Sequence, residues 1–159
     1  MKLSEYALNL LKTYVSGDNG RAPKQTGNQL VTLLNSAGCR DLYSNGLPEG
    51  LSRNPYVFNR LKAINGTKGL KVLLETMFSP RHFSDSVIDL DTTVIEVNKI
   101  LKPEGYELIK NAVGAYIIAS ADASDEETHS AVHFEKHEVM LIEEIKKAKY
   151  TLWVAVAWF

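Results

Sequence analysis

One amphipathic stripe constrains the fold of this chain more than any other feature of its sequence. Five apolar residues recur at intervals of one, three and four positions, namely Leu70, Leu73, Leu74, Met77 and Phe78. Charged residues lie on the opposite face, and Ser79-Pro80 follows directly. This spacing predicts a helix that begins near Thr67, buries one face and ends before Pro80. Other elements must cover that apolar face, because a short helix is marginal on its own in water.

Four further helices are predicted from the same periodicity. Their apolar faces are formed by Leu3, Tyr6, Leu10 and Tyr14, by Leu30, Leu33, Leu34 and Ala37, by Val57, Phe58, Leu61 and Ile64, and by Val94, Val97, Ile100 and Leu101. Thr26 and Gln29 have the spacing of a capping box at the start of the second of these helices. Pro55 suits the first position of the third, and residues 40–54 before it predict a loop.

The pattern of apolar residues changes after Gly105. Residues 106–109 and 115–119 are rich in β-branched and aromatic side chains, and the five residues between them end in Gly114. We therefore predict an antiparallel hairpin with a longer loop. Helices followed by a single hairpin indicate an α+β fold that is mainly helical and winged-helix-like.

The last forty residues have a different composition. Residues 121–132 are small, polar and acidic, which predicts a linker after a first domain at residues 1–120. Residues 133–159 predict a helix that leads into the apolar run at 151–159, which has the length and composition of a buried strand. We expect this terminal helix-strand unit to be the start of a second domain.

The cysteine content and the absence of long apolar runs favour a cytoplasmic protein. Cys39 is the single cysteine and has no intramolecular disulfide partner, which indicates a reducing compartment. Arg40 beside it favours the thiolate, but no His and Asn or Asp partner set is recognisable, so we interpret Cys39 as a small hydrophobic residue. No secretory signal is visible, and no stretch approaches the roughly 20 apolar residues of a membrane span. We expect no membrane contact.

Charge is distributed unevenly along the chain. Eleven Lys or Arg and five Asp or Glu precede Ser84, whereas seven Lys or Arg and fourteen Asp or Glu follow from there onward. Any nucleic-acid contact is therefore expected in the first half. The candidate phosphate-contacting residues of this half are Arg53, Arg60, Lys62, Lys68, Lys71 and Arg81. The alternative is that these six residues are only the solvated sides of amphipathic helices.

Three histidines recur at intervals of four residues, at His129, His133 and His137. An i, i+4 pair of this kind can bind zinc, but a third ligand from another element is usual and the chain has no HExxH motif. We interpret this segment as a solvated linker helix. The sequence therefore predicts no metal site and no cofactor.

The end of the chain resembles the opening of bacterial phospholipase D-like domains, which start with a helix ending in an Ala-Lys pair and an aromatic-rich strand. The matching residues are IEEIKKAKYTLWVAVAWF. That family catalyses with a His-x-Lys-x4-Asp motif, whose histidine attacks a phosphodiester phosphorus. The residues two positions after the four histidines of this chain are Ser84, Ala131, Glu135 and Val139. We therefore predict no catalytic residue, and the chain is not expected to be an enzyme by itself.

Residues 52–118 are similar to an amino-terminal domain of bacterial abortive-infection and phage-defence proteins of the AbiJ type. The resemblance is carried by the Phe58-x-x-Leu61 helix, the turn at residues 79–83, and Asn98-Lys99-x-Leu101 leading to Gly105-Tyr106. It implies a sensing, assembly or nucleic-acid-binding module. We thus expect a non-catalytic binding or regulatory domain ahead of a phospholipase D-like nuclease. The alternative is a module that oligomerises the effector through the C-terminal helix and strand.

Overall fold

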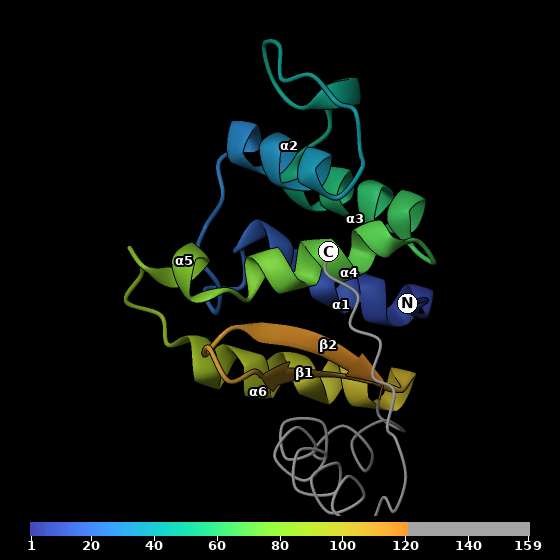
Figure 1. The fold of residues 1–159 in the computed structure, drawn as a ribbon. Coiled ribbons are helices and arrows are strands. Elements are labelled where there is room, and N and C mark those ends of the chain that lie inside the picture. Colours follow the sequence, from blue (N-terminus) through green and yellow to red (C-terminus); the bar gives the residue numbers. More distant parts are fainter. Residues whose placement is uncertain (121–159) are drawn as a thin grey trace, which may run out of the picture. The chain divides into compact units, whose positions relative to one another are not determined.

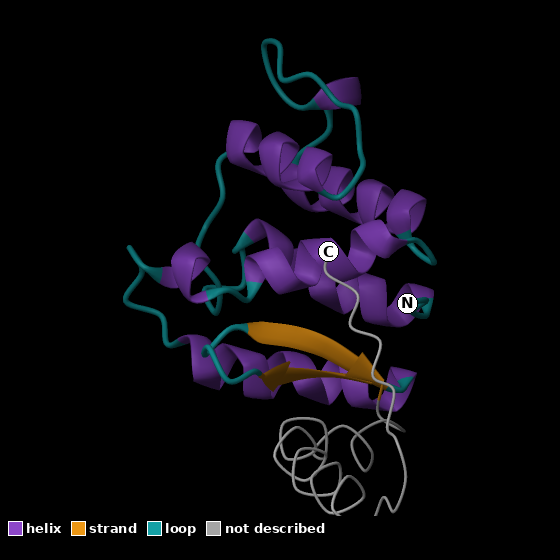
Figure 2. Ribbon diagram, viewed as in Figure 1, coloured by secondary structure: helices purple, strands orange, loops and turns teal. Residues whose placement is uncertain are grey.

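The computed structural model describes residues 1–120, which form six α-helices and one β-hairpin (Figures 1 and 2). The helices are α1 (Glu5–Ser16), α2 (Gly27–Ser36), α3 (Arg53–Ile64), α4 (Lys68–Met77), α5 (Pro80–Phe83) and α6 (Leu90–Leu101). Two 3-10 turns, η1 (Pro48–Gly50) and η2 (Lys102–Glu104), and two strands, β1 (Tyr106–Lys110) and β2 (Tyr116–Ser120), complete this part. The predicted α+β, mainly helical fold with one hairpin is confirmed. The predicted linker and terminal helix-strand unit lie outside the described residues.

Local capping signals start the helices close to where the sequence places them. Thr26 Oγ1 accepts a hydrogen bond from the Gln29 amide (3.3 Å), and Gln29 Oε1 accepts one from the Thr26 amide (2.7 Å). This reciprocal capping box begins α2 as predicted. The third predicted helix begins two residues early, at Arg53, so Pro55 occupies its third position. Pro55 is tolerated there because the first four amides of a helix have no intrahelical partner.

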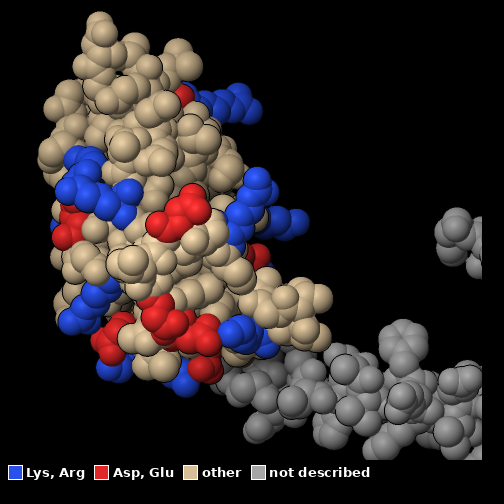
Figure 3. Space-filling view, turned by 90° about the vertical axis from the view of Figure 1, so that its left-hand side faces the viewer, with Lys and Arg blue, Asp and Glu red and all other residues tan. Residues whose placement is uncertain are grey.

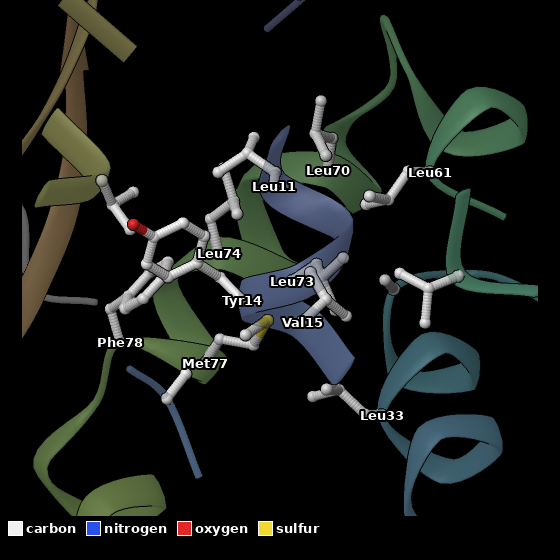
Figure 4. Packing of buried hydrophobic residues seen from close by; sticks show 14 of the residues in the cluster. Leu11, Tyr14, Val15, Leu33, Leu61, Leu70, Leu73, Leu74, Met77 and Phe78 are labelled. Atoms are coloured by element: carbon white, nitrogen blue, oxygen red, sulfur yellow. The ribbon is translucent and has the colours of Figure 1, made fainter. Parts of the chain in front are cut away.

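The stripe on α4 forms the centre of the hydrophobic core. All five of its predicted side chains are buried, with exposures of 0–1%. α4 packs against α2, α3 and β2, while α1 packs against α3 and α6. Figure 4 shows side chains from α1, α2 and α3 meeting those of α4, among them Leu11, Leu33 and Leu61. The predicted helix face at residues 70–78 is therefore confirmed.

The predicted apolar face of α1 is partly wrong. Tyr6 is 73% exposed and Leu10 is 36% exposed, whereas Leu8, Leu11 and Val15 are buried. Both sets have helical spacing, so periodicity could not choose between them. Packing against α3 and α6 on two sides turns the set containing Leu8 and Leu11 inward.

The hairpin lies against two helices rather than standing free. Leu108 and Ile118 are opposite each other in the strand register and are both buried. Asn98 on α6 accepts from the Leu108 amide (2.8 Å) and donates to its carbonyl (3.0 Å). Glu75 on α4 accepts from the Ile118 amide (2.9 Å). Side chains thus satisfy outward backbone groups of both strands, which holds the hairpin on α4 and α6.

The turn after α1 supplies a matched pair of stability tests. Gly17 and Gly20 both have positive φ, 71° and 69°, but a Cβ at Gly17 would lie 2.4 Å from the Pro23 carbonyl, while a Cβ at Gly20 would meet nothing within 4 Å. Gly20→Ala should lower the free energy of unfolding by about 1–2 kcal/mol, the cost of the left-handed backbone. Gly17→Ala should lower it by a further 1–3 kcal/mol or so, because overpacking is added. Urea unfolding of both variants measures the difference, and equal losses would contradict the packing seen at Gly17.

Candidate functional site

Arg60, one of the six predicted cationic site residues, is engaged in a structural cluster. Its Nε and Nη2 atoms donate to the two carboxylate oxygens of Asp41 at 2.6 and 3.0 Å, and Nη2 also reaches Glu49 at 3.1 Å. The Tyr56 hydroxyl donates to the same carboxylate at 2.8 Å. We call these four residues the loop clamp, because they join the loop between α2 and α3 to the α3 helix. The forked geometry uses most of the donors of Arg60 within the protein.

Burial and hydrogen bonds together set the protonation states of the loop clamp. Burial, followed by the hydrogen bond to Asp41, raises the pKa of the Tyr56 phenol, so the hydroxyl stays protonated and donates. The hydrogen bond from Arg60 lowers the pKa of Asp41 below its ordinary 3.8. Both side chains of the Arg60–Asp41 pair are less than 20% exposed. Removal of one partner would therefore leave a largely covered charge unpaired, which costs more than breaking an exposed ion pair.

Three other predicted residues also form ion pairs. Arg53 binds Asp18 and donates to the Gln25 carbonyl at 3.3 Å. Lys62 lies 3.1 Å from Glu5, and Lys71 lies 3.7 Å from Glu75 one helical turn away. These contacts match the alternative in which the cations are structural or solvated, although an exposed pair such as Lys62 with Glu5 is weak.

Lys68 and Arg81 are the two predicted residues without an ion pair among residues 1–120. Both are exposed. Lys68 begins α4, whereas Arg81 belongs to α5 beyond its other end, so the structure does not bring the two together. The six predicted residues consequently do not form one surface.

A residue missed by the sequence analysis, Lys24, shares a pocket with Arg81. The pocket has a volume of about 440 Å³ and opens between the segment before α2 and the region of α5. It is lined by Pro23, Lys24, Gln25, Gln29, Arg81, His82, Asp85, Ser86, Val87 and Ile88. Lys24 also lacks an ion pair within residues 1–120. No sequence signal indicated the site, because its walls are more than fifty residues apart in the chain.

Gln25 is a buried polar residue of this pocket, and the half-buried His82 lies beside it. Gln25 is 8% exposed, and its Nε2 donates to the Pro23 carbonyl at 3.0 Å. The same Nε2 lies 3.2 Å from His82 Nε2. Because the Gln25 amide nitrogen can only donate, His82 Nε2 must be the acceptor, and the ring proton lies on Nδ1. Burial lowers the pKa of His82, which favours this neutral form.

The backbone of Gln25 is held as firmly as its side chain. Its amide donates to the Ser16 carbonyl at the end of α1 (3.1 Å), and its carbonyl accepts from Arg53 on α3. Arg53 therefore supports the pocket although it does not line it. The pocket polar groups are positioned by two long helices, which is the arrangement that preorganised sites use.

Two other pockets of the described part have charges that are already paired. One of about 340 Å³ contains Arg21, which bonds Glu96 at 3.3 Å. The other, of about 460 Å³, contains Arg53 with its partner Asp18. An incoming anion would have to compete with these carboxylates. The pocket of Lys24 and Arg81, whose one acidic lining residue is Asp85, is therefore the candidate site.

The face of the molecule on which α5 lies is mixed in charge. Figure 3 shows acidic and basic side chains interspersed on this face, rather than a continuous basic area. Residues 1–120 hold fourteen Lys or Arg and eleven Asp or Glu. A partner would thus be attracted by a few placed cations and not by a strong overall field.

Residues 1–120 offer no arrangement that supports a metal site, a reactive cysteine or a membrane-spanning helix. No group of three His, Cys, Asp or Glu side chains converges there as a metal ion would require, and His129, His133 and His137 lie outside the described residues. Burial raises the pKa of the Cys39 thiol, so the thiol is protonated at neutral pH. None of the helices in this part has both the length and the apolar character needed to cross a bilayer.

Comparison with known proteins gives no relative for this chain. No family model, curated protein or solved structure matches it. The resemblances to the AbiJ-type domain and to the phospholipase D-like domain therefore remain predictions, as does the winged-helix likeness.

We expect one arginine and one lysine substitution on α3 to lower the free energy of unfolding by different amounts, because only the arginine belongs to the loop clamp. Arg60→Gln should lower the free energy of unfolding by about 1–3 kcal/mol, because it leaves the half-buried Asp41 carboxylate without its forked partner. Lys62→Gln, in an exposed pair, should lower it by less than about 1 kcal/mol. Chemical denaturation of both variants provides the test, and similar small losses would show that the clamp contributes little.

The lowered pKa of Asp41 predicts a pH dependence of stability. A carboxyl group whose pKa falls on folding stabilises the fold at pH values above its unfolded pKa, and this contribution is lost as pH falls through the folded pKa. The stability difference between the native chain and Asp41→Asn should therefore be constant above about pH 5 and shrink below about pH 4. Thermal unfolding across this range measures it. A difference that persists unchanged through the acid range would contradict the role of the ionised carboxylate.

Proposed function

We propose that this chain is a non-catalytic nucleic-acid-binding module that contacts phosphate groups through Lys24 and Arg81. The observation that carries the proposal is their placement: two cations from separate segments line one open pocket. Neither forms an ion pair with the other described residues. Lys and Arg side chains neutralise phosphate groups in nucleic-acid complexes and so give the binding its salt dependence.

A single strand suits this site better than a duplex. Duplex binding usually relies on an extended basic face, and the face in Figure 3 is mixed in charge. Single strands are instead bound in grooves and pockets that combine a few cations with surfaces for the bases. The open, polar pocket between two loops has that character.

The other predicted cations have smaller roles in this proposal. Arg53 supports the backbone of Gln25, and Arg60 holds the loop clamp. Lys62 and Lys71 would have to leave Glu5 and Glu75 to bind phosphate. Lys68, exposed at the start of α4, would at most add a distant contact to a longer strand.

The proposal also concerns the larger protein that the resemblances imply. An AbiJ-type module ahead of a phospholipase D-like nuclease would hold the strand whose phosphodiester bond that second domain cleaves. The division of labour is consistent with the lack of a His-x-Lys motif in this chain. Catalysis would then belong entirely to the second domain.

An oligomerisation module is the second candidate function. The C-terminal helix and strand that would form such an interface lie outside the described residues. Within residues 1–120, Tyr6 and Leu10 favour this candidate, because they are exposed apolar side chains one turn apart on α1. Scattered exposed apolar residues are common on monomers, however, so this observation is weaker than the pocket.

Binding to labelled strands tests the proposed function. The full chain should bind single-stranded RNA or DNA with an affinity that falls as salt rises from about 50 to about 200 mM. Lys24→Gln with Arg81→Gln should make the slope of log affinity against log salt shallower by about 1–2, which corresponds to two lost phosphate contacts. Fluorescence polarisation measures both quantities.

Two controls make the binding test specific. Lys2→Gln removes one positive charge at the amino terminus, away from the pocket, and should leave the salt slope unchanged. Light scattering of the same samples gives the mass in solution. A stable dimer that binds no strand at either salt concentration would overturn the proposed function and leave the oligomerisation module.

A further inference from the structure

Gln25 and His82, which both line the pocket, each have one polar side-chain atom without a hydrogen-bond partner in residues 1–120. Both hydrogens of Gln25 Nε2 are directed to Pro23 and His82, which leaves the acceptor Oε1 without a bond inside residues 1–120. The Nδ1 proton of His82 likewise has no acceptor in that part of the chain. In the same part of the chain, every side-chain nitrogen or oxygen that is shielded from solvent does have a hydrogen-bond partner. Gln25 Oε1 and His82 Nδ1 must therefore reach solvent.

One of these atoms is an acceptor and the other is a donor, and they belong to side chains whose Nε2 atoms lie 3.2 Å apart. Gln25 is 92% removed from solvent, so the orientation of its amide is set by the protein and not by bulk water. Buried polar groups in folded proteins are almost always hydrogen-bonded. A donor and an acceptor that are positioned by the protein but have no partner in it can bind water or a ligand with matching groups.

Other lining residues of the pocket complement Gln25 and His82. Val87 and Ile88 provide apolar surface on one side, with Val87 fully exposed and Ile88 partly buried against the core. Lys24 and Arg81 provide positive charge at the rim. The volume of about 440 Å³ lies in the range of sites for small organic ligands.

We infer that this pocket binds one nucleotide, with its base on Gln25 and His82 and its phosphate near Lys24 and Arg81. Each base presents hydrogen-bond donors and acceptors along its edges, so a base can donate to Gln25 Oε1 or accept the His82 Nδ1 proton. The base face would rest on Val87 and Ile88. A bare phosphate or a sugar phosphate would use the rim only.

The inference rests on the proposed function and specifies which part of the strand the module recognises. A free mononucleotide and a nucleotide within a strand offer the same groups to the pocket. Recognition of a base would also explain these two polar atoms, which simple phosphate binding does not need. The two sources of the nucleotide are distinguished by experiment.

The test compares a labelled single strand with an abasic strand of the same length and charge. The native chain should bind the base-containing strand about tenfold or more tightly than the abasic strand, since one or two hydrogen bonds to the base are lost. Gln25→Met and His82→Phe should abolish this preference, so that the two strands bind each variant with equal affinity. Both substitutions keep the size of the side chain close to that of the original.

A measurement on the native chain covers the case in which these variants fold poorly. The side-chain amide resonances of Gln25 should shift in an NMR spectrum on addition of the base-containing strand, and not with the abasic strand. Adenosine, guanosine, cytidine and uridine 5′-monophosphates, added separately, supply the free-nucleotide arm, with inorganic phosphate as the control.

Each outcome bears on a different proposal. Equal affinity for the two strands, with binding still weakened by Lys24→Gln and Arg81→Gln, would overturn the base-binding inference and support the proposed function. Shifts of Gln25 with a mononucleotide, without binding of any strand, would support the nucleotide pocket and overturn the nucleic-acid function. If the Gln25 resonances respond neither to strands nor to mononucleotides, the inference is overturned both for a nucleotide within a strand and for a free nucleotide.

Discussion

Burial of the apolar stripe on α4 is the interaction on which the rest of the structure depends. Leu70, Leu73 and Leu74 are fully buried, and α4 contacts α2, α3 and β2, so elements from both halves of the described sequence pack against one helix. The packing is close enough that a Cβ at Gly69 would lie 1.9 Å from the Ala37 carbonyl. Glycine at this position therefore allows α4 to approach the end of α2.

The candidate pocket is a consequence of how α4 ends. Ser79 caps α5 directly after α4, and this short helix brings Arg81 and His82 to the segment before α2. That segment is held by bonds from Gln25 to Ser16 and Arg53. A rigid framework thus carries a polar site on loops and short turns, a division that is common in binding proteins.

Ion pairing separates the cations that maintain the fold from those that are available to a ligand. Arg60 and Arg53 each bind a carboxylate and a second group, and both are largely covered. Lys24 and Arg81 are exposed beside a pocket. Counting charges along the sequence gives all four residues equal weight. The difference lies in Asp41, Glu49 and Asp18, whose positions relative to the arginines depend on the fold.

The sequence by itself determined the five longer helices and the hairpin, because caps, periodicity and turn residues act over a few neighbouring positions, as at Thr26 with Gln29. It did not predict the short helix α5, whose residues were interpreted as a turn. It could not decide which of two apolar stripes of α1 is buried, since both have helical spacing. Only the tertiary structure decided that question and brought Gln25 to His82, 57 residues away. Contacts at such separation depend on how the helices pack around α4, which no local pattern encodes.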